Sequence, residues 1–500
     1  MVSYIKQIAA VSVLILAGCS SVHQEVACKG GARCDKTASA NFWNEIPVSP
    51  STTVPVEIKD DYWHGQFERV NQQVAQADNS EIVFFGDSIT WHWSLGGKGK
   101  TGYKIWQENY SRYNPVNMGN SGDITPVMLY RVTHGNLNFA KGQQPKVAVL
   151  LCGINNFGVT QSDGGEVKWD LGIDCPPEDV ANGVRAVAQV FRRRLPQTRV
   201  IMMAILPVSN EVRLAGAQQA NTFNAAVTFN KDEVIYLDLK DKLLNSDGSI
   251  NEQLFTDGTH LTAKGYRIWA KSIDPYLAQI IKADPLDPVK IMLIGGSITE
   301  GVNSSGAYRR YLDGMLRREG RLIDFVGSRN KHNDNKTEPE CYQYDVDHEG
   351  HWGKNSEWLA KNMPGLLTDD APDLAVIQMG TEDIVSGSGA VESLTDQIIV
   401  NIGEVVTALR AKNRNVKIVL AKIIPVRGKA DEVKLLNLKI SRYVKAHFTV
   451  QSPVVVAELP TGFNVSQDLS DGGVLPNATG AKKMARVFAG VINDMLRISD

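Results

Sequence analysis

The chain has 500 residues, 43% of them hydrophobic and 22% charged, and a formal net charge of −2 at pH 7. This length is too great for one ordinary domain and predicts two or three. A charge so close to zero gives no reason to expect nucleic acid or another polyanion as a partner. Beyond the N-terminal segment, no apolar run approaches the ~18 residues that a membrane-spanning helix needs.

The N-terminal segment MVSYIKQIAAVSVLILAGCSS has one early cation, then an apolar run, then small residues, a pattern typical of an export signal. Its ending, LAGC, resembles the lipobox of bacterial lipoproteins. The resemblance implies a signal peptide at residues 1–18 and lipid attachment at Cys19, which would anchor the protein to a membrane. Because Ser20 follows Cys19, it also implies the outer membrane, facing the periplasm or the surface. A plain signal peptide cleaved elsewhere is the alternative.

Residues 19–50 are rich in Ser, Thr, Val and Pro without a clear period and are predicted to form a tether. Export would permit disulfides. Cys152 lies in a strand-like run and is expected to be simply buried. The pairing of the other cysteines stays open among Cys28, Cys34, Cys175 and Cys341.

From residue 51 to residue 283, short apolar runs alternate with helical patterns, including predicted helices at 179–194 and 263–281. Continuous apolar strands separated by helices predict a parallel sheet that is covered on both faces. The five predicted strands are 81–85, 115–118, 147–151, 199–206 and 234–239.

The segment 284–288, with two prolines and no apolar face, is predicted to be a linker. The same pattern then restarts over residues 289–500 and ends in a predicted helix at 478–496. The chain is therefore expected to hold two similar α/β domains, each with a five-stranded parallel sheet. The strands predicted in the second domain are 290–294, 323–327, 374–379, 417–421 and 454–458.

The first domain carries the parts that ester hydrolysis by a serine requires: a hydroxyl, a base, a group that orients the base, and donors for the oxyanion. Ser88 follows the first strand, near a helix start that favours an anion. Gly122 follows the second strand and Asn155 the third, and each can offer an N–H donor. Asp257 and His260 follow the fifth, at a spacing that lets the carboxylate hold the imidazole toward the serine. Ligands bind at this carboxyl edge in open parallel sheets.

The segments GDSIT, the glycine of SGD, GINN and DGTH, in this order, resemble the four blocks of the SGNH (GDSL) hydrolases. IWQENY and NMGNSGD resemble the branch of the platelet-activating-factor acetylhydrolase catalytic subunits. The resemblance implies a flavodoxin-like three-layer fold, no metal or other cofactor, and removal of a short acyl group such as acetyl. It implies Ser88 as nucleophile, Asp257 and His260 as the rest of the triad, and Ser88, Gly122 and Asn155 as the oxyanion hole.

Several other features of the first domain have a structural explanation or lack part of a known motif. Trp91, His92 and Trp93 either line the cleft or pack the helix that follows Ser88, while His134 is expected to be structural. The segment SLGGKGKT ends like a phosphate-binding loop, but it lacks the first required glycine. No GxSxG motif is present, so an α/β-hydrolase fold is not expected.

The second domain repeats the first turn as LIGGSITE, and IGGSITEG, DHEGHWG and MGTED resemble acetylxylan-esterase-like SGNH members. Ser297 takes the nucleophile position and Gly353 that of the oxyanion glycine. Glu382 stands where the resemblance expects Asn, and a carboxylate repels an oxyanion. Leu475 aligns with His260, so the serine lacks its base, a loss of ~10²–10⁴ in rate. The second domain is therefore predicted to be non-catalytic.

Two further mismatches mark this domain: Gly296 replaces the usual aspartate before the serine, and Asp471 is one residue away from alignment with Asp257. His348 and His351 are poorly placed to act as a substitute base, and a metal site around them is not expected.

These features predict an exported, lipid-anchored esterase that removes acetyl groups, with acylated carbohydrate or another small ester as the substrate. A lipid or lysophospholipid acyl hydrolase of the platelet-activating-factor acetylhydrolase type is the alternative enzyme. A glycan-binding or envelope-organising protein with vestigial activity is the alternative of another class.

Overall fold

The structure is a computed structural model that describes residues 41–94, 102–140, 143–158, 175–283, 286–301, 308–330, 344–367 and 371–497. The chain divides into two compact units, residues 1–286 and 287–500, and the division falls inside the predicted linker. Within the described ranges, every helix is too short or too polar to span a bilayer. Some predicted features lie outside these ranges: the signal peptide, Cys19, Cys28, Cys34, Cys341 and nearly all of SLGGKGKT.

The first unit is built on a five-stranded sheet with strand order β2-β1-β3-β4-β5, in which all neighbours are parallel. This is the flavodoxin-like order, with a switch point between β1 and β3. The predicted parallel α/β fold is thereby confirmed. The strands are β1 (Ile82–Gly86), β2 (Val116–Gly119), β3 (Val147–Leu151), β4 (Arg199–Met203) and β5 (Val234–Leu237).

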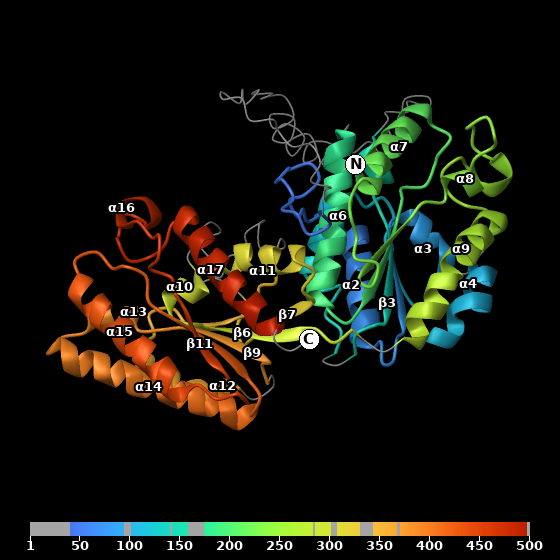
Figure 1. Ribbon diagram of the computed structural model, residues 1–500. Helices are drawn as coiled ribbons and strands as arrows, with labels where there is room; N and C mark the ends of the chain where they lie inside the picture. Colours follow the sequence, from blue (N-terminus) through green and yellow to red (C-terminus); the bar gives the residue numbers. More distant parts are fainter. Residues whose placement is uncertain are drawn as a thin grey trace. The chain divides into compact units, whose positions relative to one another are not determined.

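Helices cover both faces of this sheet, as Figure 1 shows for α6 on one side of β3 and α3 and α9 on the other. Neighbouring residues of a strand point to opposite faces, and in β1 both directions are filled with aromatic rings. Phe84 packs against Trp93 and Trp106, while Phe85 packs against Phe191 of α6. The helices are α2 (Asp61–Ala75), α3 (Ser88–Ser94), α4 (Tyr103–Tyr110), α5 (Thr125–Thr133), α6 (Pro177–Arg194), α7 (Glu211–Ala225), α8 (Lys240–Leu243) and α9 (Ala263–Lys282), with short 3₁₀ turns at Ser111–Tyr113, Ile154–Asn156 and Glu252–Leu254.

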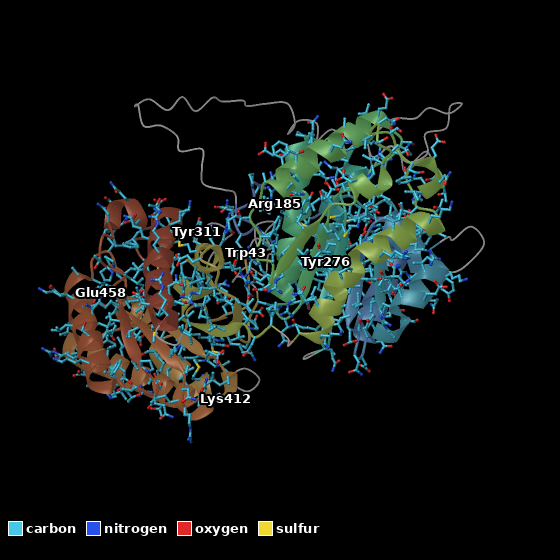
Figure 2. All side chains as sticks on the ribbon, turned by 45° about the vertical axis from the view of Figure 1, so that its right-hand side comes forward. Trp43, Arg185, Tyr276, Tyr311, Lys412 and Glu458 are labelled. Carbon is cyan, nitrogen blue, oxygen red and sulfur yellow. The ribbon has the colours of Figure 1, made fainter. Side chains whose placement is uncertain are left out.

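The N-terminal segment of the first unit corrects the predicted tether. Residues 41–50 pack against the unit, because Phe42, Trp43 and Ile46 bury their side chains. Gln189 of α6 donates to the carbonyl of Phe42 at 2.6 Å, and the guanidinium of Arg193 lies over the Trp43 ring (Figure 2 labels Trp43). The Ser/Thr-rich composition hid these three apolar residues, whose burial makes the segment part of the fold.

The second unit repeats the strand order, as β11-β10-β9-β6-β7, again with parallel pairs. It departs from the predicted five strands by a sixth, β8, which pairs with Ile294 and Gly295 of β6. β7 pairs only with the earlier part of β6, up to Met292. β7 and β8 therefore share the place beside β6 that β2 alone takes in the first unit. A strand of two residues, such as β8, is too short to show a sequence pattern that would predict it. The strands are β6 (Val289–Gly295), β7 (Ile323–Val326), β8 (Glu349–Gly350), β9 (Leu374–Gln378), β10 (Lys417–Ala421) and β11 (Val454–Ala457).

The second unit also has helices on both faces of its sheet (Figure 1). Ile291 and Leu293 of β6 enter a core shared with α11 and α17, while Met292 and Ile294 enter a core shared with α12, α14 and α15. The alternation within β6 confirms a three-layer arrangement. The helices are α10 (Ser297–Glu300), α11 (Tyr308–Arg318), α12 (Ser356–Leu366), α13 (Thr381–Ser386), α14 (Val391–Lys412), α15 (Ala430–His447), α16 (Val465–Asp468) and α17 (Ala478–Arg497).

Candidate active site

Ser88 is the first residue of α3 and directly follows the turn that ends β1. Asp87 organises this turn, since its carboxylate accepts a hydrogen bond from the Ile89 N–H and its carbonyl one from the Trp91 N–H, both at 2.9 Å. Ser88 is largely buried, with 9% of its surface exposed. The turn therefore fixes the serine at the carboxyl edge of the sheet, at the start of a helix.

Ser88, His260 and Asp257 form a continuous hydrogen-bonded chain. Ser88 Oγ lies 2.8 Å from His260 Nε2, and His260 Nδ1 lies 2.7 Å from Asp257 Oδ2. Burial raises the pKa of Asp257, but hydrogen bonds from His260 and Thr259 outweigh this and leave the pKa below its usual value. The carboxylate thus stays ionised and holds the imidazole with its second nitrogen toward the serine.

The loop that carries Asp257 and His260 is held at three points. Asp257 Oδ1 accepts from the N–H groups of Thr259 and His260, which makes a tight turn. Gly258 has φ +77° and its carbonyl accepts from the Ser209 N–H, while an added Cβ would meet Ser209 Oγ at 1.9 Å. Only glycine fits this position without a shift. The triad geometry therefore depends on the loop after β4 as well as on its own loop.

The candidate oxyanion donors lie in the loops after β2 and β3. Gly122 has φ +81°, and apart from its chain neighbours no atom lies within 4 Å of the position that a Cβ would take, so that side of the residue is open. Asn155 is half-buried, and its Nδ2 donates to the carbonyl of Asp123 at 3.1 Å. This bond joins the two loops. Because an amide nitrogen carries two N–H groups, one donor of Asn155 remains for a substrate.

A buried ion pair beside Gly122 could not be predicted from the sequence. Asp123 Oδ2 lies 2.6 Å from Arg131 Nη1, and both side chains are fully buried. Trp63 Nε1 and Asn120 Nδ2 donate to the other carboxylate oxygen at 3.0 and 3.1 Å. Burial raises the pKa of Asp123, while Arg131 and the hydrogen bonds oppose this. The pair holds the loop rigid, and the aspartate in SGD was the only sequence signal for it.

Two charged groups beside the candidate site were missed as well. Arg213 of α7 donates from Nη2 to Asn155 Oδ1 at 3.3 Å and to the carbonyl of Ile154 at 3.2 Å. Asp87 is fully buried, and burial raises its pKa to about 6 although the Ile89 N–H and His260 oppose the shift. No spacing rule links residues 87, 155 and 213, so only the fold could reveal this arrangement.

Of the three aromatic residues after Ser88, one packs in the core and another borders the candidate site. Trp93 is fully buried and packs against Tyr266 and Trp269 of α9, so it belongs to the core. Trp91 and His92 are half-buried, and the ring of His92 lies 4.4 Å from that of His260. His92 therefore borders the candidate site.

The remaining candidates in the first unit have structural surroundings. His134 is exposed and stacks on Tyr130. Cys152 is buried, and burial raises the pKa of its thiol. Cys175 is buried too, and its Sγ donates to the carbonyl of Ser51 at 3.7 Å. Neither Cys152 nor Cys175 forms a disulfide in the structure, so Cys175 drops out of the pairing that the sequence left open.

In the corresponding site of the second unit, the backbone donors around the serine are already bound within the unit. Ser297 Oγ accepts from the Gly353 N–H at 2.9 Å, and Glu382 Oε1 accepts from the Ser297 N–H at 3.2 Å. The backbone donor that would hold an oxyanion is thus bound to a carboxylate. A Cβ on Gly296 would lie 3.1 Å from Glu382 Cγ and 3.1 Å from the carbonyl of Lys354, so the bare glycine makes room for this arrangement.

The last loop of the second unit corresponds closely to the loop of the triad. The Ser470 N–H donates to the carbonyl of Leu475, as the Thr256 N–H does to that of His260, both at 2.8 Å. Ser470 and Leu475 are five positions apart, whereas Thr256 and His260 are four apart. The loop of the second unit is therefore one residue longer than the triad loop. Leu475 stands at the place of the base and packs against the core. Asp471 is exposed.

The histidines of the second unit are engaged beside β8. His351 Nε2 lies 2.5 Å from Glu349 Oε1, and His348 Nδ1 accepts from the Gly350 N–H at 3.0 Å. Asp347 is half-buried nearby. Across the part of the chain that the structure describes, no three His, Cys, Asp or Glu side chains gather into a possible metal site.

Comparison with known proteins defines the class of this chain. Residues 84–268 and 293–483 each match the GDSL-like lipase/acylhydrolase family. The two segments together cover well over half of the chain, which therefore belongs to this family. The predicted membership of the SGNH (GDSL) hydrolases is confirmed, and it supports hydrolysis of ester bonds.

Individual relatives agree with the predicted branch. Platelet-activating factor acetylhydrolase IB subunit alpha2 of Rattus norvegicus is 28% identical over 229 residues, which are 45% of this chain and 88% of the relative. Subunit alpha1 of Homo sapiens is 28% identical over 245 residues, which are 48% of this chain and 93% of the relative. Among solved structures, a crystal structure of an acetyl esterase mutant with an acetate ion is 31% identical, covers 42% of this chain and 100% of its own, and has a TM-score of 0.38. The structure of a carbohydrate esterase family 3 protein from Talaromyces cellulolyticus is 31% identical, covers 42% of this chain and 98% of its own, and has a TM-score of 0.38.

Proposed function

We propose that the first unit is a serine esterase with Ser88 as nucleophile, His260 as general base and acid, and Asp257 as the group that orients the histidine. The observation that carries this proposal is the chain of two hydrogen bonds from Ser88 Oγ through His260 to Asp257, at 2.8 and 2.7 Å. Family membership supports the reaction class.

In the proposed reaction, Ser88 Oγ attacks the acyl carbon of an ester while its proton moves to His260 Nε2. Negative charge develops on the former carbonyl oxygen, where the N–H groups of Ser88 and Gly122 and the free N–H of Asn155 stabilise it. The alcohol leaves with the proton from His260, and the acyl group stays on Ser88. Water then attacks the acyl-enzyme with His260 again as base, and the acid is released.

For the substrate, we propose a short acyl ester, most simply an acetate ester of a carbohydrate. Two of the relatives described above are named as acetylhydrolases, which favours acetyl as the acyl group. The carbohydrate part of the proposal comes from the predicted export signal and lipid attachment at Cys19, which would place the enzyme among envelope and extracellular glycans. A Cys19→Ala variant should then move from the membrane fraction to the soluble fraction.

A second candidate substrate is an acetylated phospholipid, because the same relatives are named for platelet-activating factor. The deciding experiment measures acetate release from acetylated xylan and from an acetylated glycerophospholipid at matched ester concentration. Faster release from xylan supports the carbohydrate proposal, and faster release from the phospholipid overturns it. Release from neither, with p-nitrophenyl acetate also untouched, would overturn the esterase proposal itself.

We further propose that the second unit is non-catalytic and binds glycan or supports the first unit structurally. Glu382 bound to the Ser297 N–H, and Leu475 in the place of the base, favour this assignment. Retention of acetylated xylan by the Ser88→Ala protein, lost on deletion of residues 287–500, would support glycan binding, and equal retention without them would contradict it.

A further inference from the structure

Arg213 is placed where it can control a candidate oxyanion donor. It is the third residue of α7, and its backbone N–H is capped by Asn210 Oδ1 at 3.0 Å, which fixes the start of the helix. From there its guanidinium reaches the loop after β3 and donates from Nη2 to the carbonyl of Ile154 and to Asn155 Oδ1. The cation is thus tied to both the backbone and the side chain of this loop.

These contacts determine which way the Asn155 amide faces. Its oxygen accepts from Arg213, and its nitrogen donates to the carbonyl of Asp123. If the amide were turned over, its oxygen would face the Asp123 carbonyl oxygen and its N–H₂ group would face the guanidinium. Both contacts would be repulsive, so the pair of neighbours selects one orientation. In that orientation the second amide N–H is left for the developing oxyanion.

The charge of Arg213 adds to this effect. A hydrogen bond from a cation to the amide oxygen polarises the amide and makes its N–H groups stronger donors. Arg213 Nε and Asp87 Oδ2 are both buried without a hydrogen-bond partner among the described residues. Burial disfavours the charged form of Arg213, and the attraction of the Asp87 carboxylate, which acts without a direct hydrogen bond, opposes this effect.

We propose that Arg213 is a positioning residue for the ester hydrolysis, acting through Asn155 Oδ1 to hold the amide N–H₂ group toward the oxyanion. The inference rests on the proposed function of the first unit. It predicts an effect on the transition state rather than on substrate binding, because the oxyanion exists only after attack.

The test is a double-mutant cycle with p-nitrophenyl acetate, using Arg213→Met, Asn155→Ala and the double variant. Asn155→Ala should lower kcat by ~10²–10³. Arg213→Met should lower kcat by roughly 10-fold with KM within about twofold, as expected for a group that supports a donor. In the double variant, loss of Arg213 should lower kcat by less than about twofold beyond Asn155→Ala, since its target is gone.

Arg185→Met is the matched control. Arg185, on α6 and labelled in Figure 2, is also a partly buried arginine that donates to an asparagine oxygen, that of Asn224. It contacts no residue of the candidate site in the described hydrogen bonds and should leave kcat unchanged. Arg213→Lys keeps the charge but lacks the planar group that reaches both acceptors, so its kcat should also fall.

Three results would overturn the inference: kcat of Arg213→Met equal to wild type, additive losses in the double variant, or a loss confined to KM. If Arg213→Met shows no cooperative thermal unfolding, Arg213→Lys decides by the same criteria in the same two backgrounds. Failure of the proposed function is seen separately, as wild-type protein without hydrolysis or a Ser88→Ala variant that retains it.

Discussion

The two clefts stand on the same strand order, yet within the residues that the structure describes a hydrogen-bonded triad is present only in the first. In the first, Asp87 precedes the serine and Asn155 follows β3; in the second, Gly296 and Glu382 take these places. The two changes fit together, because a Cβ on Gly296 would press against the Glu382 side chain at 3.1 Å. The second cleft is therefore a consistent alternative packing, and restoring one residue alone would not rebuild a site.

The parts that the two clefts still share are those that hold the fold. Asn156 Oδ1 accepts from the Thr125 N–H at the start of α5, and Asp383 accepts from the Ser356 N–H at the start of α12. Each of these residues directly follows the position at which the clefts differ. The contact at the helix start thus persists although Glu382 stands in place of Asn155, since buried backbone groups need partners in either case.

The largest expected difference between the clefts concerns their serines. Ser88→Ala should lower hydrolysis of p-nitrophenyl acetate by at least about 10³-fold, because the nucleophile is removed. Ser297→Ala should leave the rate within about twofold of wild type. The rates are measured on full-length protein at equal concentration, with thermal unfolding as the check on folding. A large loss in Ser297→Ala, with Ser88→Ala active, would reverse the assignment of the two units.

The two aspartates of the last loops give the next comparison. Asp257→Asn should lower kcat by ~10²–10⁴, because an amide cannot hold the imidazole in the required tautomer as a carboxylate does. Asp471→Asn, the equivalent change in the longer loop of the second unit, should leave kcat unchanged. Equal losses in both variants would show that the rate reflects the stability of the chain rather than the triad.

Most of the fold could be predicted from the sequence, because apolar runs of the sheet are continuous and the helices between them are periodic. Strands such as β3 and β10 fall on the predicted residues. The misses have local causes. β8 is two residues long, and the packed residues 41–50 are set in a Ser/Thr-rich composition. Short pairings and single buried aromatics carry too little pattern to be read from sequence.

The site divides in the same way. Ser88, Asp257 and His260 could be placed because each follows a strand in a known order of blocks. Arg213 could not be assigned, since its hydrogen bond to Asn155 and its attraction to Asp87 depend on how α7 meets the loop after β3. The role of Glu382 was predicted as repulsive, and the structure adds its hydrogen bond to the Ser297 N–H. Long-range side-chain contacts of this kind have no sequence period.

A third comparison concerns the residue directly before the serine, which is the buried Asp87 in the first cleft and Gly296 in the second. Burial raises the pKa of Asp87 from 3.8 to about 6, so the folded state binds its proton more tightly than the unfolded state. Asp87 therefore contributes its full amount to the free energy of unfolding below about pH 3.8. This contribution, roughly 3 kcal/mol, is lost as the pH rises to about 6 and beyond. Asp87→Asn, which is neutral, should therefore stabilise the protein more at about pH 8 than at about pH 4.

Chemical denaturation at the two pH values measures this difference, with Asp241→Asn as the control because Asp241 is exposed in the same unit. Wild type and variant share all other titrating groups, so only the change in their difference with pH counts. A gain in unfolding free energy that is equal at both pH values would contradict a raised pKa for Asp87.

The smallest expected effect tests whether the second cleft lacks one part or several. In a Ser88→Ala background, Glu382→Asn should free the Ser297 N–H and supply an amide donor, yet hydrolysis should stay within about twofold of Ser88→Ala alone. The reason is that Leu475 still occupies the place of the base, so Ser297 stays protonated and a poor nucleophile. Recovery of activity by more than about 10-fold would mean that Glu382 alone silences this cleft, and that a base for Ser297 comes from elsewhere in the second unit.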